Sequence, residues 1–143
     1  MKIKLLVIGK TVPDFLARGV EEYISRLSHY CSFELEVLPD VKRQPSTAPE
    51  KLKDLEAEAF LKKITPRDEV VLLDDKGREF SSEEFAGQIE KWQLAGHACL
   101  VFIIGGAFGF GKALFDRSGK QVSLSRMTFS HQMVRLIFAE QLY

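Results

Sequence analysis

The sequence contains few cysteines and no spacing that is typical of a metal site. Its 143 residues include two cysteines, Cys31 and Cys99, and three histidines, His29, His97 and His131. Neither C-x-x-C nor H-x-x-x-H occurs, and the histidines are widely separated, so we expect no bound metal. Cys99 lies in an apolar run, where a reduced and packed thiol is the expected state.

The sequence also has no excess of charge of one sign and no long apolar segment. The 20 basic residues equal the 20 acidic residues, which gives a formal net charge of zero at pH 7. This balance excludes strong non-specific attraction to nucleic acid, although a local basic patch remains possible. The first apolar run is too short for a signal peptide, and no run approaches the length of a membrane span. We expect a cytoplasmic protein, and residues 1–143 are expected to form a single domain.

Short apolar runs alternate with helical patterns along the chain. Continuous apolar strands separated by helices are typical of an α/β domain, with a mainly parallel sheet and helices on both faces. One strand alternates apolar and acidic residues and is expected near a sheet edge. The helix after Ser81 begins with a capping box that Ser81 forms with Glu84, and Gly96 ends it. The predicted strands are 3–8, 33–37 (the alternating one), 69–73, 99–104 and 121–124, and the other predicted helices are 14–27, 50–64 and 133–143.

Polar or glycine-rich loops follow three of these strands. LDDKG begins at Leu73, GGAFG begins at Gly105, and SRMTFS begins at Ser125. Ligands of open α/β sheets bind outside the carboxyl ends of the strands. We therefore expect these three loops to converge on one site.

The stretch GGAFGFGKA, residues 105–113, almost matches a nucleotide-binding P-loop. Gly106, Gly111 and Lys112 fit G-x-x-x-x-G-K, but Ala113 replaces the hydroxyl residue that binds Mg²⁺. The stretch also lies late in the chain, and the dinucleotide fingerprint G-x-G-x-x-G is absent. Two interpretations remain open. The glycines supply positive φ in a strand-to-helix turn, or they clear side chains so that a flat ligand lies against the backbone.

Motifs over nearly the whole chain resemble the RlmH family of SPOUT-class RNA methyltransferases. They are GK at 9–10, EYISRL at 22–27, LDDKG at 73–77, FSSEEFA at 80–86, GGAFG at 105–109, and LS-x-MT-x-x-HQ-x-x-R-x-x-x-x-EQ-x-Y at 124–143. The resemblance implies a C-terminal trefoil knot, a feature that no periodicity argument would suggest. It also implies a homodimer that uses S-adenosyl-L-methionine to methylate N3 of a pseudouridine in the 23S rRNA of the assembled ribosome, without a metal.

The resemblance also implies which residues bind the cofactor. By position, they are Leu73, Gly105, Gly106, Ser125, Arg126, Met127, Thr128, Phe129 and Ser130. Leu73, Met127 and Phe129 suit an apolar slot for adenine. An ordinary strand residue is the alternative for Leu73, and an N-cap of the last helix is the alternative for Ser130.

No catalytic base is assigned from the sequence, and His131 and Arg135 are weak candidates. His131 either accepts a proton or orients the cofactor loop through a carbonyl. Arg135 either holds a phosphate or pairs with Glu140. Five basic residues either contact RNA or are solvated surface charges: Lys10, Lys42, Arg43, Lys51 and Lys53.

The last predicted helix, 133–143, is apolar around most of its circumference, so we expect it to pack on two sides. In the family, substrate-binding and catalytic side chains lie in a tail beyond the position of Tyr143, where the printed sequence ends. A non-catalytic module that binds the ribosome or senses the cofactor is therefore the alternative function.

Overall fold

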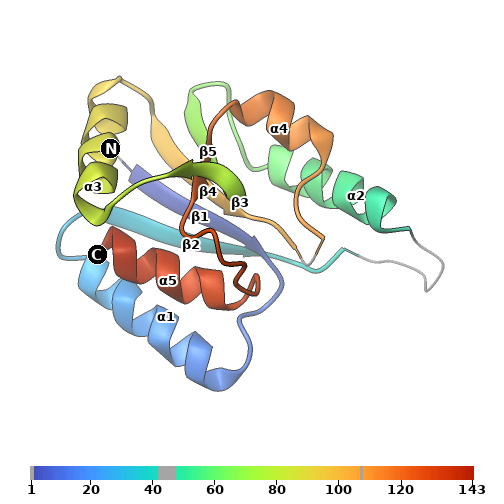
Figure 1. Cartoon of the computed structure of the whole chain (residues 1–143), viewed down its shortest axis with the longest axis horizontal. Helices are drawn as coiled ribbons and strands as arrows, with labels where there is room; N and C mark the ends of the chain where they lie inside the picture. The colour runs from blue at the N-terminus through green and yellow to red at the C-terminus, as the bar shows by residue number, and fades with distance from the viewer. Residues whose placement is uncertain (1, 42–47, 107) are drawn as a thin grey trace.

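The computed structural model describes residues 2–41, 48–106 and 108–143. Its centre is one five-stranded sheet in which every pairing is parallel, with the order β2-β1-β4-β3-β5 (Figure 1). The strands are β1 (Lys2–Ile8), β2 (Ser32–Leu38), β3 (Asp68–Glu79), β4 (Cys99–Ile104) and β5 (Gln121–Ser123). β4 is buried at all positions because it lies in the middle, whereas the alternating β2 lies at an edge. The predicted α/β class is confirmed.

Five helices cover both faces of the sheet (Figure 1). Alternate residues of the central strands point to opposite faces. On one face, Leu5 and Val7 pack with Phe85 and Trp92 of α3 and with Phe138 of α5, and α1 lies beside α5. On the other face, α2 and α4 pack over the residues that alternate with these. The helices are α1 (Asp14–Leu27), α2 (Pro49–Leu61), α3 (Ser82–Leu94), α4 (Lys112–Ser118) and α5 (Met133–Leu142).

Local signals in the sequence placed several element ends correctly. The capping box is present: the Ser81 N–H donates to Glu84 Oε1 at 2.8 Å, and the Glu84 N–H donates to Ser81 Oγ at 3.1 Å. Gly96 adopts φ +84° after α3. Cys99 is buried and free, as predicted.

Two predicted elements need correction. α2 ends at Leu61 rather than at 64, and its buried face contains Glu56 and Ala57, whereas Leu55 and Ala59 are only half-buried. β3 continues past Leu73 to Glu79. LDDKG is therefore part of an irregular strand and not a separate loop. In the part of the chain that the structure describes, no helix is both long and apolar enough to cross a bilayer.

Candidate functional site

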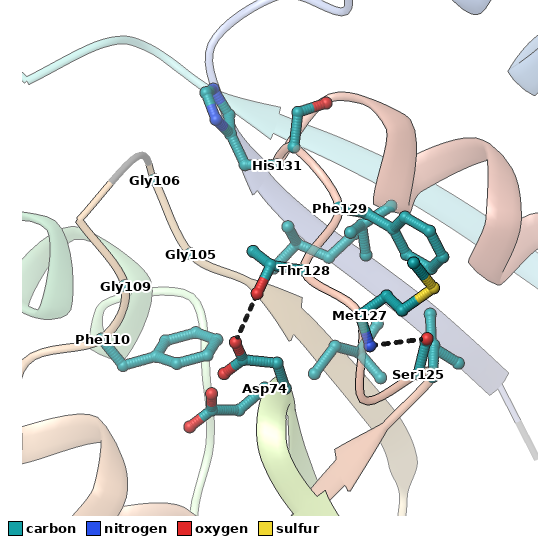
Figure 2. A pocket seen from close by; sticks show the side chains of 16 residues that line it. Asp74, Gly105, Gly106, Gly109, Phe110, Ser125, Met127, Thr128, Phe129 and His131 are labelled. Carbon is teal, nitrogen blue, oxygen red and sulfur yellow. Dashed lines mark hydrogen bonds between the residues drawn. The ribbon is translucent and has the colours of Figure 1, made fainter.

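The three predicted loop segments meet at one cavity of about 450 Å³ (Figure 2). The cavity lies at the carboxyl ends of β4 and β5 and beside the middle of β3, where the regular pairing of β3 stops at Leu73. Its size is typical of small-molecule pockets. Its lining residues are Leu73, Asp74, Asp75, Ile104, Gly105, Gly106, Gly109, Phe110, Leu124, Ser125, Met127, Thr128, Phe129, Ser130, His131 and Val134. The expected convergence is confirmed.

All of the predicted cofactor residues except Arg126 line this cavity. The side chain of Arg126 is 88% exposed, and its Nε donates to Glu79 Oε1 at 2.8 Å. Sequence reasoning did not assign Asp74 and Asp75, although the LDDKG motif that contains them was identified. It also did not assign Phe110, whose ring lies at the cavity in Figure 2.

A bulge in β3 brings the two aspartates to the cavity. Leu73 and Arg78 both align with Val122 of β5, so the residues between them leave the regular ladder. At Gly77, an added Cβ would lie 2.6 Å from the backbone carbon of Gln121. The close approach of β5 therefore requires glycine at this position, and the bulge places Asp74 and Asp75 beyond the end of the regular pairing.

Hydrogen bonds hold the 125–130 segment over the side of the cavity opposite the β3 bulge. Ser125 Oγ accepts from the Met127 N–H at 2.9 Å, and Thr128 Oγ1 donates to Asp75 Oδ2 at 3.0 Å, which joins this segment to β3 (Figure 2). Ser130 Oγ accepts from the Met133 N–H at 3.1 Å. This bond satisfies one free donor at the start of α5. The N-cap of α5 is Gln132, however, so Ser130 supports the helix start from two residues before the cap, and the prediction that it is the N-cap is wrong.

The cavity wall carries negative charge near neutral pH. Burial raises the pKa of Asp74, whereas hydrogen bonds from Asp74 and Thr128 lower the pKa of Asp75. Burial and the nearby Arg135 lower the pKa of His131, and Asp40 opposes them. A neutral imidazole and the ionised Asp75, whose pKa is lowered, favour a cationic ligand and disfavour a triphosphate, which argues against ATP.

The glycine-rich turn is closely packed on its protein side. A Cβ on Gly106 would lie 2.5 Å from Glu56 Oε2, and a Cβ on Gly111 would lie 2.8 Å from the Lys53 carbonyl oxygen. The Gly109 N–H donates to the Gly106 carbonyl at 3.1 Å. Positive φ, at +90°, occurs at Gly109. The turn leads from β4 into α4 with Gly111 as the N-cap, as predicted. Positive φ explains only Gly109, whereas Gly105 and Gly111 closely approach backbone atoms and Gly106 approaches the Glu56 side chain.

His131 and Arg135 have different environments. His131 lines the cavity. Arg135 is 1% exposed, and its guanidinium donates to the carbonyls of Ile8 at 2.7 Å and Gly9 at 2.8 Å and to Thr11 Oγ1 at 2.9 Å. Both suggested roles of Arg135 are therefore wrong: a buried guanidinium cannot reach an RNA phosphate, and its bonds run to the end of β1 rather than to Glu140.

Gln132 also contacts the turn that follows β1, a role that the sequence did not reveal. Its Oε1 accepts from the Val12 N–H at 3.1 Å, and its Nε2 donates to the Lys10 carbonyl at 3.2 Å. Gln132 and Arg135 together fix the turn between β1 and α1 through these hydrogen bonds. In the sequence, both residues closely follow the 125–130 segment of the cavity.

Three of the five predicted RNA-contacting residues lie in the described part of the chain: Lys10, Lys51 and Lys53. Lys10 and Lys51 are exposed, and Lys53 Nζ lies 3.0 Å from Glu50 Oε1. Lys42 and Arg43 lie outside the described residues. Among the residues that the structure describes, no cluster of His, Cys, Asp and Glu side chains could hold a metal ion.

Comparison with known proteins gives full-length matches. The family model described as "Predicted SPOUT methyltransferase" matches residues 1–143. The chain is 51% identical to the ribosomal RNA large subunit methyltransferase H of Porphyromonas gingivalis. It is 46% identical to the proteins of that name from Parabacteroides distasonis and Flavobacterium psychrophilum. Each match covers 100% of this chain and 91% of the relative.

Proposed function

This chain belongs to the SPOUT methyltransferase family, and from that premise we propose that it methylates large-subunit ribosomal RNA with S-adenosylmethionine as the methyl donor. The observation that carries the proposal is the cavity beside the β3 bulge and the ends of β4 and β5, which is lined by the motifs on which the family resemblance rests. The names of the relatives support RNA of the large ribosomal subunit as the substrate. The finer proposal is N3 of a pseudouridine in 23S rRNA, within the assembled ribosome.

The residues of the cavity fit such a donor. Leu73, Met127 and Phe129 supply apolar surface for an adenine ring, and the backbone of Gly105 and Gly106 is accessible from the cavity. Asp75, whose pKa is lowered, supplies negative charge for a cationic group. A cavity with an apolar wall and a few polar groups is typical of cofactor sites.

In the proposed mechanism, the bound donor supplies an electrophilic methyl group on a sulfonium. The residues of the chain hold this group in line with the attacking nitrogen, which is a large part of the rate enhancement in such transfers. An imide N3–H of pseudouridine is a weak acid and is mostly neutral at pH 7, so a proton acceptor assists its attack. His131 is the candidate acceptor, because its lowered pKa leaves a ring nitrogen unprotonated near neutrality.

The test is methyl transfer to ribosomes isolated from a strain that lacks the modification. With labelled S-adenosylmethionine, we expect label in the large-subunit rRNA at one pseudouridine. Absence of label from purified wild-type protein that binds the donor would favour the alternative of a non-catalytic module. That alternative predicts co-sedimentation with ribosomes and donor binding by calorimetry, without methyl transfer.

The remaining proposals are a homodimer, a C-terminal trefoil knot, a single domain and a cytoplasmic location. The family resemblance supports the first two, and the continuous sheet supports a single domain. Sedimentation at micromolar concentration checks the dimer. A monomer under those conditions contradicts it.

A further inference from the structure

Glu56 is a carboxylate on the buried face of a helix. α2 turns Leu52, Glu56 and Phe60 toward the sheet, and Glu56 is 7% exposed. Burying an ionised carboxylate is costly unless polar groups compensate for the lost water. An apolar side chain would satisfy packing at this position, so the carboxylate indicates a more specific task.

The carboxylate lies against the backbone of Gly106. An added Cβ on Gly106 would lie 2.5 Å from Glu56 Oε2 and 2.8 Å from Oε1. The same turn contacts α2 a second time, where a Cβ on Gly111 would lie 2.8 Å from the Lys53 carbonyl oxygen and 3.2 Å from Ala57 Cβ. α2 therefore supports this glycine turn at two points.

The turn that rests on α2 is also a wall of the cavity. Gly105, Gly106 and Gly109 line the cavity, and the Gly106–Gly109 hydrogen bond closes the turn. At Gly106, no side chain separates the Glu56 carboxylate from the backbone that borders the cavity. The carboxylate therefore lies directly against backbone that borders the cavity.

We propose that Glu56 is a positioning residue of the methyltransferase, whose carboxylate fixes Gly106 at the wall of the donor cavity and so sets the affinity for the methyl donor. This inference rests on the proposed function of the cavity. It also assigns Gly106 a reason to be glycine, namely that a methyl group there would displace the carboxylate.

The experiment measures KM for S-adenosylmethionine, kcat and the thermal midpoint for Glu56→Ala, Glu56→Gln, Gly106→Ala and the double variant Glu56→Ala with Gly106→Ala. Affinity for the demethylated product is measured by calorimetry. Glu58→Ala is the matched control on the exposed face of α2, and Gly87→Ala is the matched glycine control, because no atom lies within 4 Å of a Cβ there. Gly106→Ala keeps Glu56 in the chain and serves as the independent probe if Glu56→Ala does not fold.

We expect Glu56→Ala and Gly106→Ala each to raise KM for the donor about tenfold, the scale of a lost contact to a charged group. Glu56→Gln keeps the length and one carbonyl oxygen, so its KM stays within about threefold of wild type. The double variant is no worse than the poorer single variant, because both changes remove one contact. The controls leave KM unchanged.

If wild type binds the donor, either of two results overturns the inference. One is an unchanged KM in Glu56→Ala with a lower thermal midpoint alone, which indicates a merely structural role. The other is a double variant whose losses multiply. If wild type binds no donor, the proposed function itself fails, and this inference fails with it.

Discussion

At the scale of single residues, the two carboxylates of the β3 bulge decide which charge the cavity accepts. Asp74 is half-buried and Asp75 is exposed, and both line a wall whose other titratable side chain is the imidazole of His131. S-adenosylmethionine carries one more positive charge than the product that remains after methyl transfer. Under the proposed function, the negative charge of Asp75 favours this donor over the product by an electrostatic difference.

Replacement of Asp75 by Asn tests this electrostatic preference. We expect affinity for S-adenosylmethionine to fall about three- to tenfold, with affinity for the neutral product changed much less, as for a partly solvated charge pair. Calorimetry with both ligands measures the ratio. The matched control is Glu90→Gln, at an exposed position on α3. Equal losses for the two ligands contradict the electrostatic explanation.

His131 gives a prediction about pH. Burial and Arg135 lower its pKa, so the folded state holds the imidazole neutral at pH 7. If His131 accepts the proton, kcat/KM falls as the pH drops below the ordinary histidine pKa of about 6.5, and His131→Asn loses this acid limb along with most of the activity. A pH–rate profile that keeps the same acid limb in the variant removes His131 from this role.

The lowered pKa of His131 also predicts how the stability of the fold depends on pH. Because the unfolded state binds a proton more readily than the folded state, protonation of His131 destabilises the fold as the pH falls below about 6.5, and no such loss arises above that pH. His131→Asn should therefore flatten the dependence of the thermal midpoint on pH in this range. An unchanged slope between wild type and variant is the opposing result.

At the scale of elements, the site depends on where strands and helices are joined. The bulge of β3 lies where β5 closely approaches Gly77. The buried Arg135 links α5 to the end of β1 through its hydrogen bonds. Both junctions adjoin cavity segments. Damage to either one is expected to reduce donor binding together with stability.

Gly77→Ala tests the first junction. The new Cβ would lie 2.6 Å from backbone atoms of Gln121, which cannot move as a side-chain end can. We expect a loss of about 1–3 kcal/mol in the free energy of unfolding, typical of overpacking. Gly87→Ala is the control in α3, where we expect a gain of up to about 1 kcal/mol from helix propensity. Denaturant titration of both variants measures the difference in the free energy of unfolding. Similar stabilities contradict the close approach of β5 to Gly77.

Arg135→Met tests the second junction. The change leaves the carbonyls of Ile8 and Gly9 without their side-chain donor in a buried position. We expect a loss of about 2–4 kcal/mol in the free energy of unfolding. The exposed Arg18→Met should change it by less than about 0.5 kcal/mol. If urea titrations show comparable small effects at both positions, the guanidinium does not hold α5 to β1.

At the scale of the whole molecule, the sequence predicted the layers well and the details of the site unevenly. Apolar runs located the buried strands because buried parallel strands are continuously hydrophobic, and the alternating pattern located β2 at the edge of the sheet. Periodicity could not place Glu56 inward, since a charge on a helix predicts a solvent-facing position. It also could not show that Arg135 is buried, because the carbonyls that it binds are brought near only by folding. The cofactor residues came from the family resemblance, whereas Asp74 and Asp75 required the β3 bulge to be seen.

The central claim is that the cavity beside the β3 bulge and the ends of β4 and β5 holds the methyl donor. A crystal structure of the protein with S-adenosylmethionine or its demethylated product tests it most directly. The account predicts the nucleoside between Leu73, Gly106 and the 125–130 segment, with its cationic side toward Asp75. A ligand bound elsewhere on the molecule, or an empty cavity at a saturating concentration of the nucleoside, would contradict the account.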